Sequence, residues 1–243
     1  MAAKGNNGGG ARWFYVALAG LVVAGAAWLF TAGGPEGDAE APAPLSLAET
    51  TAIEADPAAG TAIGPEDAPV VIYDFSDYLC PHCRDFNAMV GKLLRREFAG
   101  PGGPLRWVSY EFPLQEASIP ATLAAHCAGE QGRYWDMHDM LFARVDAWAR
   151  ESNPTGTFVD LAEEMGMDGR ALRSCIRERR GLRQILGAKQ YGVELGVTGT
   201  PTIFVNGEAV PRTNQYYSYP GLAALLRDAA SGPAAAEAGG AGS

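Results

Sequence analysis

The residues best suited to chemistry are two cysteines separated by two residues, in the run Cys80-Pro81-His82-Cys83. An apolar stretch at residues 70–75 precedes this run and predicts a buried strand, and a helical apolar pattern follows it. The pair therefore falls at the first turn of a helix, where unpaired backbone N–H groups and the helix dipole favour a thiolate at Cys80. Cys83, one turn further in, is the natural partner for a disulfide with Cys80.

Apolar periodicity outlines the elements around this pair. Residues 105–112 alternate as a second strand, a helical block fills about 116–196, and residues 202–205 return to strand. These elements predict an α/β domain with helices inserted between two strand-bearing halves. The helix behind the cysteines is predicted to bury one face, which carries Phe86, Met89, Val90, Leu93 and Leu94.

A CxxC pair can also be half of a zinc site. Such a site would need another CxxC or closely spaced histidines, but the remaining cysteines, Cys127 and Cys175, stand alone in the sequence. His126 and His138 lie at helical spacing and are interpreted as structural. Redox chemistry is therefore favoured over metal binding, and we assign no metal.

A second motif lies far along the chain, where Gly199-Thr200-Pro201 forms a turn directly before a β-branched strand and an Asn206-Gly207 turn. Together with the CPHC helix, this motif resembles the thioredoxin superfamily. The resemblance implies that the bond before Pro201 is cis and that this proline faces the cysteine pair. A cis bond before proline is expected only in such a specified turn.

The closer resemblance is to the DsbA-like branch of that superfamily, the disulfide-forming proteins of bacterial envelopes. It covers roughly residues 68–227 and includes the run HCAGEQGRYWDMHD at residues 126–139. The implied fold is α/β, a thioredoxin fold with a helical insertion at about 116–196 between the CxxC half and the cis-proline half. One N-terminal transmembrane or signal helix is expected to precede it.

The resemblance and the chemistry of thiol–disulfide exchange suggest a role for each residue of the CPHC run. Cys80 is the expected nucleophile, which forms a mixed disulfide, and Cys83 resolves that intermediate. Pro81 fits the first helical turn and limits flexibility between the sulfurs. His82 is expected to stabilise the Cys80 thiolate, which would make the disulfide more oxidising; the alternative is that its side chain only points to solvent.

Three further residues complete the predicted site. Asp74 lies six residues before Cys80 and matches the buried acid that relays protons to the second cysteine in the superfamily. A buried carboxyl would have a raised pKa and could act as a general base, although Asp74 could instead reach solvent at the strand end. The resemblance places Thr200 and Pro201 opposite the disulfide, where the edge at Thr200 can pair with an extended substrate peptide.

The other two cysteines, Cys127 and Cys175, fall on apolar helix faces within the predicted insertion. One interpretation is two buried free thiols that behave as small hydrophobes. The other is a structural disulfide that pins two insertion helices together. An even cysteine count in an exported protein favours the disulfide.

The N-terminal region predicts export. Residues 1–12 form a cytoplasmic tail that carries Lys4 and Arg12, and residues 13–30 have no charge and suffice for a membrane anchor. Because no Lys or Arg follows until Arg84, the positive-inside rule places the rest of the chain outside the cytoplasm. The alternatives are a cleaved signal peptide and a buried core helix.

The remaining segments are low in large apolar residues. Residues 31–64 are rich in Ala, Pro, Gly and acid, which predicts a disordered linker. The folded domain is expected at 65–230, with a disordered tail at 231–243. The net charge of −9 argues against nucleic acid and against anionic membrane surfaces as targets.

These features predict a thiol:disulfide oxidoreductase of the bacterial cell envelope, anchored with its domain on the periplasmic or extracytoplasmic side, or secreted if the signal is cleaved. It would donate the Cys80-Cys83 disulfide to unfolded or reduced exported proteins and need no other cofactor. A separate membrane oxidase, resembling the quinone-linked DsbB or vitamin K epoxide reductase type, would reoxidise it.

Three other functions fit parts of the pattern. A disulfide reductase or isomerase would use the same site in the opposite direction. A soft-metal chaperone would capture copper with the two thiolates, but the nearest methionine, Met89, is expected in the core. A noncatalytic module that binds unfolded chains would not require an intact CPHC run.

Overall fold

The computed structural model describes residues 53–231, and within them five strands form one sheet in the order β1-β3-β2-β4-β5. β2 pairs in parallel with β3 and antiparallel with β4, so β2 is the central strand. β1 pairs antiparallel with β3 at one edge, and β5 pairs antiparallel with β4 at the other. The strands are β1 (Thr61–Ile63), β2 (Val70–Ser76), β3 (Leu105–Glu111), β4 (Thr202–Val205) and β5 (Glu208–Ala209).

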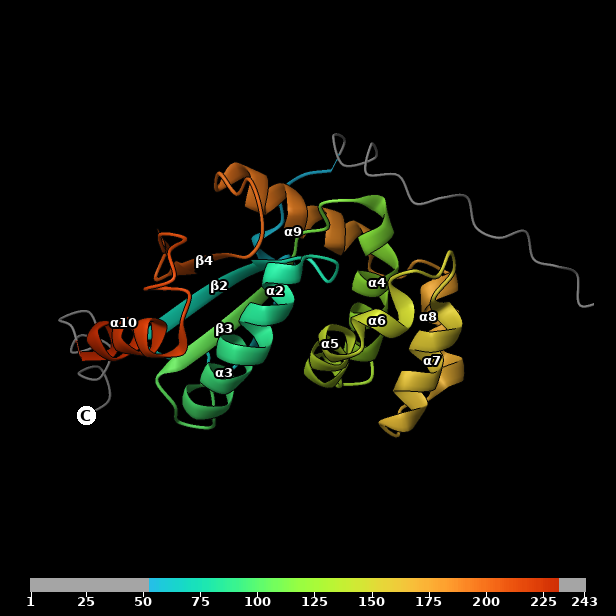
Figure 1. Cartoon of the computed structure of the whole chain (residues 1–243), viewed down its shortest axis with the longest axis horizontal. Helices are drawn as coiled ribbons and strands as arrows, with labels where there is room; N and C mark the ends of the chain where they lie inside the picture. The colour runs from blue at the N-terminus through green and yellow to red at the C-terminus, as the bar shows by residue number, and fades with distance from the viewer. Residues whose placement is uncertain (1–52, 232–243) are drawn as a thin grey trace, which may run out of the picture. The chain divides into compact units, whose positions relative to one another are not determined.

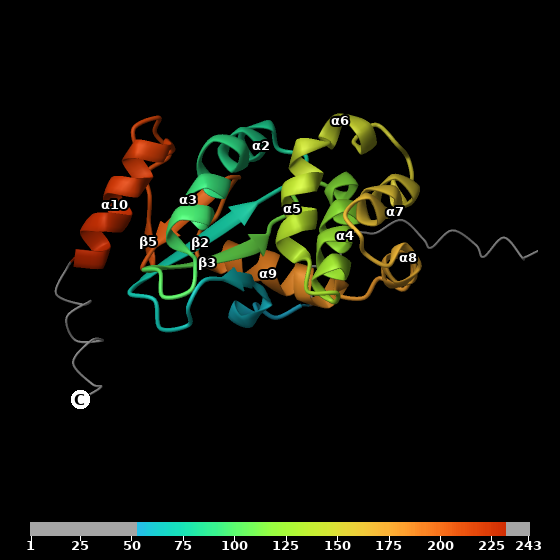
Figure 2. The ribbon, with the colours of Figure 1, turned by 90° about the horizontal axis from the view of Figure 1, so that it is seen from below.

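Helices cover both faces of this sheet (Figures 1 and 2). One face packs against η2 (Pro57–Ala59) and α9 (Leu182–Glu194). The other face packs against α2 (Pro81–Phe86), the π-helical turn η3 (Asn87–Gly91), α3 (Lys92–Phe98) and α10 (Tyr219–Ser231). The predicted α/β fold is confirmed.

The helical insertion packs beside the sheet rather than over it (Figure 2). With α9 it accounts for residues 116–194, close to the predicted range. Its elements before α9 are η4 (Glu116–Ser118), α4 (Ile119–Gly129), α5 (Tyr134–Ala143), α6 (Val145–Trp148), α7 (Thr155–Glu164) and α8 (Gly169–Arg177).

Alternation along the central strands decides which side chains meet which helices. Ile72 of β2 and Trp107 of β3 are fully buried beneath α2, α3 and α10. Phe75 and Tyr110 point to the opposite face and stack with ring centroids 4.8 Å apart, toward α9. Successive strand residues point to opposite faces, so each face collects its own core.

The predicted linker ends too late. Residues 57–63 belong to the fold, because β1 pairs with β3 and the N–H of Asp56 donates to the carbonyl of Gly187. The Tyr110 hydroxyl also donates to the carbonyl of Pro57 at 2.7 Å. Backbone hydrogen bonds hold this segment, which its poor apolar content did not reveal.

The predicted buried face of the CPHC helix is only partly right. Phe86, Val90 and Leu94 are buried, as expected for residues spaced by four. Met89 is 62% exposed and Leu93 is 45% exposed, so the prediction that Met89 lies in the core is wrong. The sheet covers one row of this helix, and the adjacent row faces solvent.

Several predicted segments lie outside the described residues: the tail at 1–12, the anchor or signal at 13–30, most of the linker, and the end of the chain from 232. Within residues 53–231, no helix combines the length and apolar character needed to cross a bilayer.

Candidate active site at the CPHC helix

The loop between β2 and α2 is fixed by a buried aspartate. Asp77 is 1% exposed, and its carboxylate accepts hydrogen bonds from the N–H groups of Leu79 and Leu114, each at 2.7 Å. It also accepts from the Ser118 hydroxyl at 2.9 Å. Asp77 therefore ties the entry to the CPHC helix to the start of the insertion. An Asp whose side chain binds the backbone two residues later is a recognisable turn pattern, which the sequence reasoning left unused.

Cys80 is the N-cap of α2, and Pro81 occupies the first turn, as predicted from the sequence. The Cys80 side chain is partly exposed, and its pKa is lowered to about 5. The hydrogen bond from the Cys83 thiol contributes most, and the Thr200 hydroxyl and backbone N–H groups add to it against the effect of burial. At neutral pH Cys80 is therefore a thiolate that solvent can reach.

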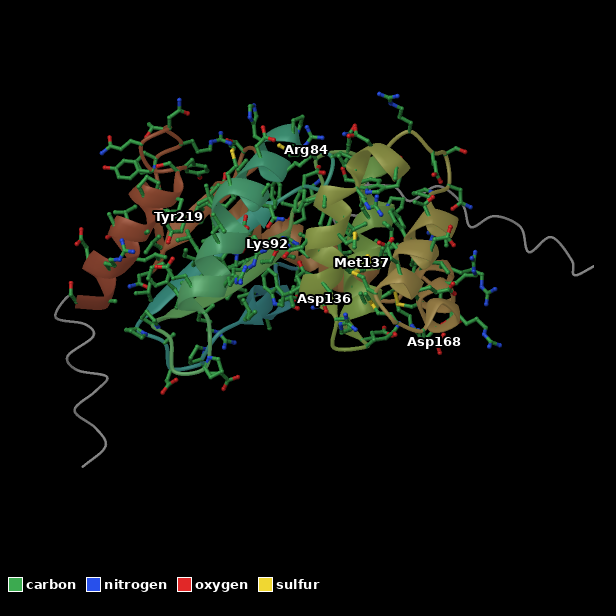
Figure 3. All side chains as sticks on the ribbon, turned by 60° about the horizontal axis from the view of Figure 1, so that its bottom comes forward. Arg84, Lys92, Asp136, Met137, Asp168 and Tyr219 are labelled. Carbon is green, nitrogen blue, oxygen red and sulfur yellow. A yellow bond between two sulfur atoms is a disulfide. The ribbon has the colours of Figure 1, made fainter. Side chains whose placement is uncertain are left out.

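Cys83 differs from Cys80 in both its exposure and its pKa. It is 1% exposed and belongs to the apolar core of the insertion, together with Tyr78 and Met137. Burial raises the pKa of the Cys83 thiol far above its ordinary value, and the hydrogen bond to Cys80 raises it further. The pair thus consists of one accessible thiolate and one buried thiol. Figure 3 labels Arg84 on α2, the helix that carries the pair, Lys92 on α3, and Met137 on neighbouring α5.

His82 is exposed in the described structure. Its backbone N–H is among the groups that lower the pKa of Cys80. The proposed stabilisation of the thiolate by the imidazole stays a prediction.

The second motif meets the first in space. The Thr200-Pro201 bond is cis, and Cys80 Sγ lies 3.4 Å from the carbonyl oxygen of Thr200, to which it donates when it is protonated. The Thr200 hydroxyl is buried without a hydrogen-bond partner at ordinary distance among the described residues. Thr200 nevertheless lowers the pKa of both cysteine thiols. Residues 120 positions apart therefore form one site.

Asp74 is buried in the middle of the sheet rather than at a solvent-exposed strand end, with 3% exposure. Burial raises the pKa of its carboxyl to about 6, partly offset by a hydrogen bond from the Ser76 hydroxyl at 2.6 Å and by the nearby Arg95 guanidinium. No described hydrogen bond joins Asp74 to Cys83. Both of them raise the pKa of Tyr217, so this tyrosine lies within electrostatic reach of each.

Arg95 is a buried cation that sequence reasoning missed. It donates to the Asp139 carboxylate at 2.7 Å and stacks over the ring of Trp135 at 4.6 Å. These contacts join α3 to α5 of the insertion. Its buried charge also lowers the pKa of Asp74.

Cys127 and Cys175 lie apart from the CPHC pair and form a disulfide between α4 and α8, with Cα atoms 5.7 Å apart. Both are buried in the insertion core. His138 is also buried, and its Nδ1 lies 2.9 Å from the Tyr78 hydroxyl. Within the described residues, no group of three His, Cys, Asp or Glu side chains is placed to hold a metal ion.

Comparison with known proteins agrees with this geometry. The sequence model of the thioredoxin family matches residues 57–222. The chain belongs to the thioredoxin family. The structure of BdbD from Bacillus subtilis in its oxidised form superimposes with a TM-score of 0.64 at 22% identity, covering 74% of this chain and 98% of that one.

Two relatives of this thioredoxin-family chain carry different names. Disulfide bond formation protein D of Bacillus subtilis is 24% identical, over 63% of this chain and 71% of that protein. Na(+)/H(+) antiporter NhaA 1 of Salinispora arenicola is 31% identical over 74% of this chain. The chain spans only 26% of the length of that antiporter, so the similarity is to one part of a larger protein.

Proposed function

We propose that the protein is a thiol:disulfide oxidoreductase that oxidises dithiols with its Cys80-Cys83 disulfide. The observation that carries the proposal is the asymmetry of the pair: an accessible Cys80 sulfur with a pKa of about 5 beside a buried Cys83 thiol, facing the cis-proline turn. A low-pKa thiol is a good leaving group, and a buried one is protected from other reagents.

Each step of the exchange balances. A substrate thiolate attacks Cys80 Sγ of the disulfide, forms a mixed disulfide and releases Cys83 as a thiolate, which takes up a proton. The second substrate thiolate then attacks the substrate sulfur of the mixed disulfide and releases Cys80 as a stable thiolate. The substrate loses two electrons and becomes a disulfide, while the CPHC pair gains them.

The surrounding residues have assigned roles in this proposal. Asp74, with a pKa of about 6, exchanges protons with Cys83 during its release and attack. Pro81 limits the flexibility between the two sulfurs, and His82 adds to the stabilisation of the Cys80 thiolate. The backbone at Thr200, beside the cis Pro201, pairs with an extended segment of the substrate.

The proposed cellular setting is supported by the relatives and by the N-terminal sequence. We place the domain on the outer side of a bacterial membrane, anchored through residues 13–30, with reduced exported proteins as substrates. Reoxidation of the reduced pair requires an acceptor, for which a membrane oxidase of the DsbB or vitamin K epoxide reductase type is the proposed partner. The name of the Bacillus relative, disulfide bond formation protein D, supports this direction of flux.

The first test is the reduction potential of the CPHC pair in the full chain, measured by equilibration with glutathione buffers. Cys127→Ser and Cys175→Ser substitutions remove the other disulfide from the readout. A potential more oxidising than the glutathione couple supports the proposal, because the Cys80 thiolate stabilises the reduced form. A strongly reducing potential would mean that the protein delivers electrons as a reductase.

A trapping experiment tests the order of attack. With Cys83→Ser, a peptide that carries a single cysteine as its mixed disulfide with glutathione should become covalently joined to Cys80, because the Cys80 thiolate displaces glutathione and no second thiol is present to release the peptide. The matched Cys80→Ser variant should capture no peptide. Capture by Cys83 in the latter variant would reverse the assigned roles.

Copper capture is the competing function, and the exposure of Met89 removes one objection to it. The state of Cys83 argues against it, because soft metals bind thiolates and burial keeps this residue a thiol. Equilibrium dialysis against Cu(I) distinguishes the two functions. Tight stoichiometric copper without peptide oxidation would favour the chaperone.

A further inference from the structure

A second acid, the partly buried Glu111, lies on the same face of the sheet as Asp74. Glu111 ends β3, in register with Ser76 of β2, just as Ser109 is in register with Asp74. Because side chains alternate along a strand, these four polar residues share the face that carries Ile72 and Trp107 further back. The two central strands are thus apolar at their beginnings and polar where they approach the CPHC loop.

The Glu111 carboxyl is the centre of a hydrogen-bond network. Its Oε1 accepts from the Tyr134 hydroxyl at 2.6 Å and from the Tyr78 hydroxyl at 2.9 Å. Tyr134 Oη also lies 3.1 Å from Ser109 Oγ, and Tyr78 Oη lies 2.9 Å from His138 Nδ1. The network therefore connects β3, the segment before Cys80, and α5 of the insertion.

When Glu111 is ionised, the protons in this network have one consistent arrangement. If both phenols donate to Glu111, the Tyr78 oxygen must accept from Nδ1–H of His138. The other ring nitrogen of His138 is then an unprotonated acceptor, and it is buried without a partner among the described residues. Burial lowers the pKa of His138, so the imidazole is neutral and can adopt this tautomer.

Glu111 itself is ionisable in an accessible pH range. Burial raises its pKa to about 8; the two phenols oppose that shift, whereas two neighbouring carboxylates favour it. The charge of Arg95 interacts electrostatically with both phenols and lowers the pKa of the His138 imidazole, and no described hydrogen bond joins Arg95 to Glu111. The titratable groups around Glu111 are Asp74, Asp77, Tyr78, Arg95, Tyr134 and His138.

We propose that Glu111 is a positioning residue for thiol–disulfide exchange, acting through Tyr78 on the backbone that leads into Cys80. Tyr78 stands two residues before Cys80 and shares the insertion core with Cys83. An ionised carboxylate accepts hydrogen bonds more strongly than a neutral carboxyl group, so ionisation of Glu111 tightens its hold on Tyr78. The inference rests on the proposed function of Cys80.

The test is the rate at which Cys80 in the reduced full chain reacts with iodoacetamide between pH 6 and 10. Because the pKa of Cys80 is about 5, its thiolate fraction is already constant over this range. Any step near pH 8 must therefore come from another group. We expect a step of about threefold in the rate, which corresponds to about 0.65 kcal/mol in the activation free energy of alkylation.

Glu111→Gln should abolish this step, because the amide keeps the shape of the side chain but cannot ionise. Glu66→Gln is the matched control, since Glu66 is an exposed loop residue before β2, and it should keep the step. A flat profile in the unsubstituted protein, or a step that survives in Glu111→Gln, would overturn the proposal.

Two phenol variants keep the proposal testable if Glu111→Gln does not fold. Tyr78→Phe should lose the step, and Tyr134→Phe should keep it, because only Tyr78 belongs to the segment before Cys80. Equal behaviour of both variants would overturn the route through Tyr78. The reagent is small and needs no protein substrate, so a failed peptide-oxidation assay would reject the proposed function while leaving this result intact.

Discussion

The two cysteine pairs of this chain have opposite surroundings. Cys80 caps a helix at the edge of the sheet, where the hydrogen bond from the Cys83 thiol, together with Thr200 of the cis-proline turn and backbone N–H groups, lowers its pKa to about 5. Cys127 and Cys175 lie on inner faces of α4 and α8, are 1% exposed, and are joined across a sequence separation of 48. The comparison teaches that position sets the state of a cysteine: at a helix start it is an accessible thiol of low pKa, and inside an apolar core it is a cross-link.

The largest effect should come from removing the structural pair. Cys127→Ser with Cys175→Ser should lower the free energy of unfolding by up to about 4 kcal/mol, from the loop-entropy model for a separation of 48. Urea unfolding under non-reducing conditions measures this change. The potential of the CPHC pair should stay the same, and a changed potential would show that the two pairs are coupled.

Near the CPHC pair, by contrast, the buried acid Asp74 should destabilise the folded protein when its carboxyl is ionised. The pKa of Asp74 in the folded protein is about 6, above the value of 3.8 for an unperturbed Asp, so the native state binds the extra proton. Its unfavourable contribution is absent below about pH 4, grows as the pH rises to about 6, and is complete above that. Asp74→Asn should therefore stabilise the protein at pH 8 by at most about 3 kcal/mol.

Unfolding of Asp74→Asn in urea at pH 4 and pH 8 checks this sign. The gain should be confined to pH 8, and slower release of mixed disulfides should accompany it if Asp74 relays protons to Cys83. If the difference in unfolding free energy between the variant and the parent were the same at pH 4 and pH 8, the burial argument would be contradicted. Unchanged release would remove the relay role.

A smaller effect is expected at the turn that faces the reactive pair. Thr200→Val removes a hydroxyl that lowers the pKa of Cys80. It should raise this pKa by roughly one unit, which is about a tenfold decrease in the acid dissociation constant of the thiol. Thiolate absorbance at 240 nm as a function of pH measures it. The matched control is Thr202→Val, because the Thr202 hydroxyl donates to the carbonyl of Gly199 instead. A comparable shift in the control would point to a general disturbance of the turn.

The smallest effect should come from His82. Its side chain is exposed, and a charge in contact with water interacts weakly. His82→Ala should therefore decrease the acid dissociation constant of the Cys80 thiol by about threefold or less, measured by the same absorbance titration. A loss larger than that of Thr200→Val would show that the imidazole contacts the thiolate directly.

Local sequence signals were sufficient for the centre of the site. The CPHC run after an apolar strand placed Cys80 at a helix start, and Gly199-Thr200-Pro201 before a β-branched run indicated a turn, which the resemblance placed opposite the cysteines. The resemblance that these motifs carry supplied the fold and the cis bond before Pro201, which the structure contains. These features depend on short stretches of chain, so periodicity and turn chemistry identify them.

What the sequence by itself determined is therefore the CPHC pair, the helix that it begins and the presence of a turn before Pro201. Only the tertiary structure decided that Asp77, Glu111, Tyr78 and His138 gather behind that pair, because they come from a loop, a strand and an insertion helix far apart in sequence. It also decided that Met89 is exposed and that residues 61–63 form an edge strand. Each of these depends on which surfaces pack together, and that is fixed by long-range burial and strand pairing rather than by local pattern.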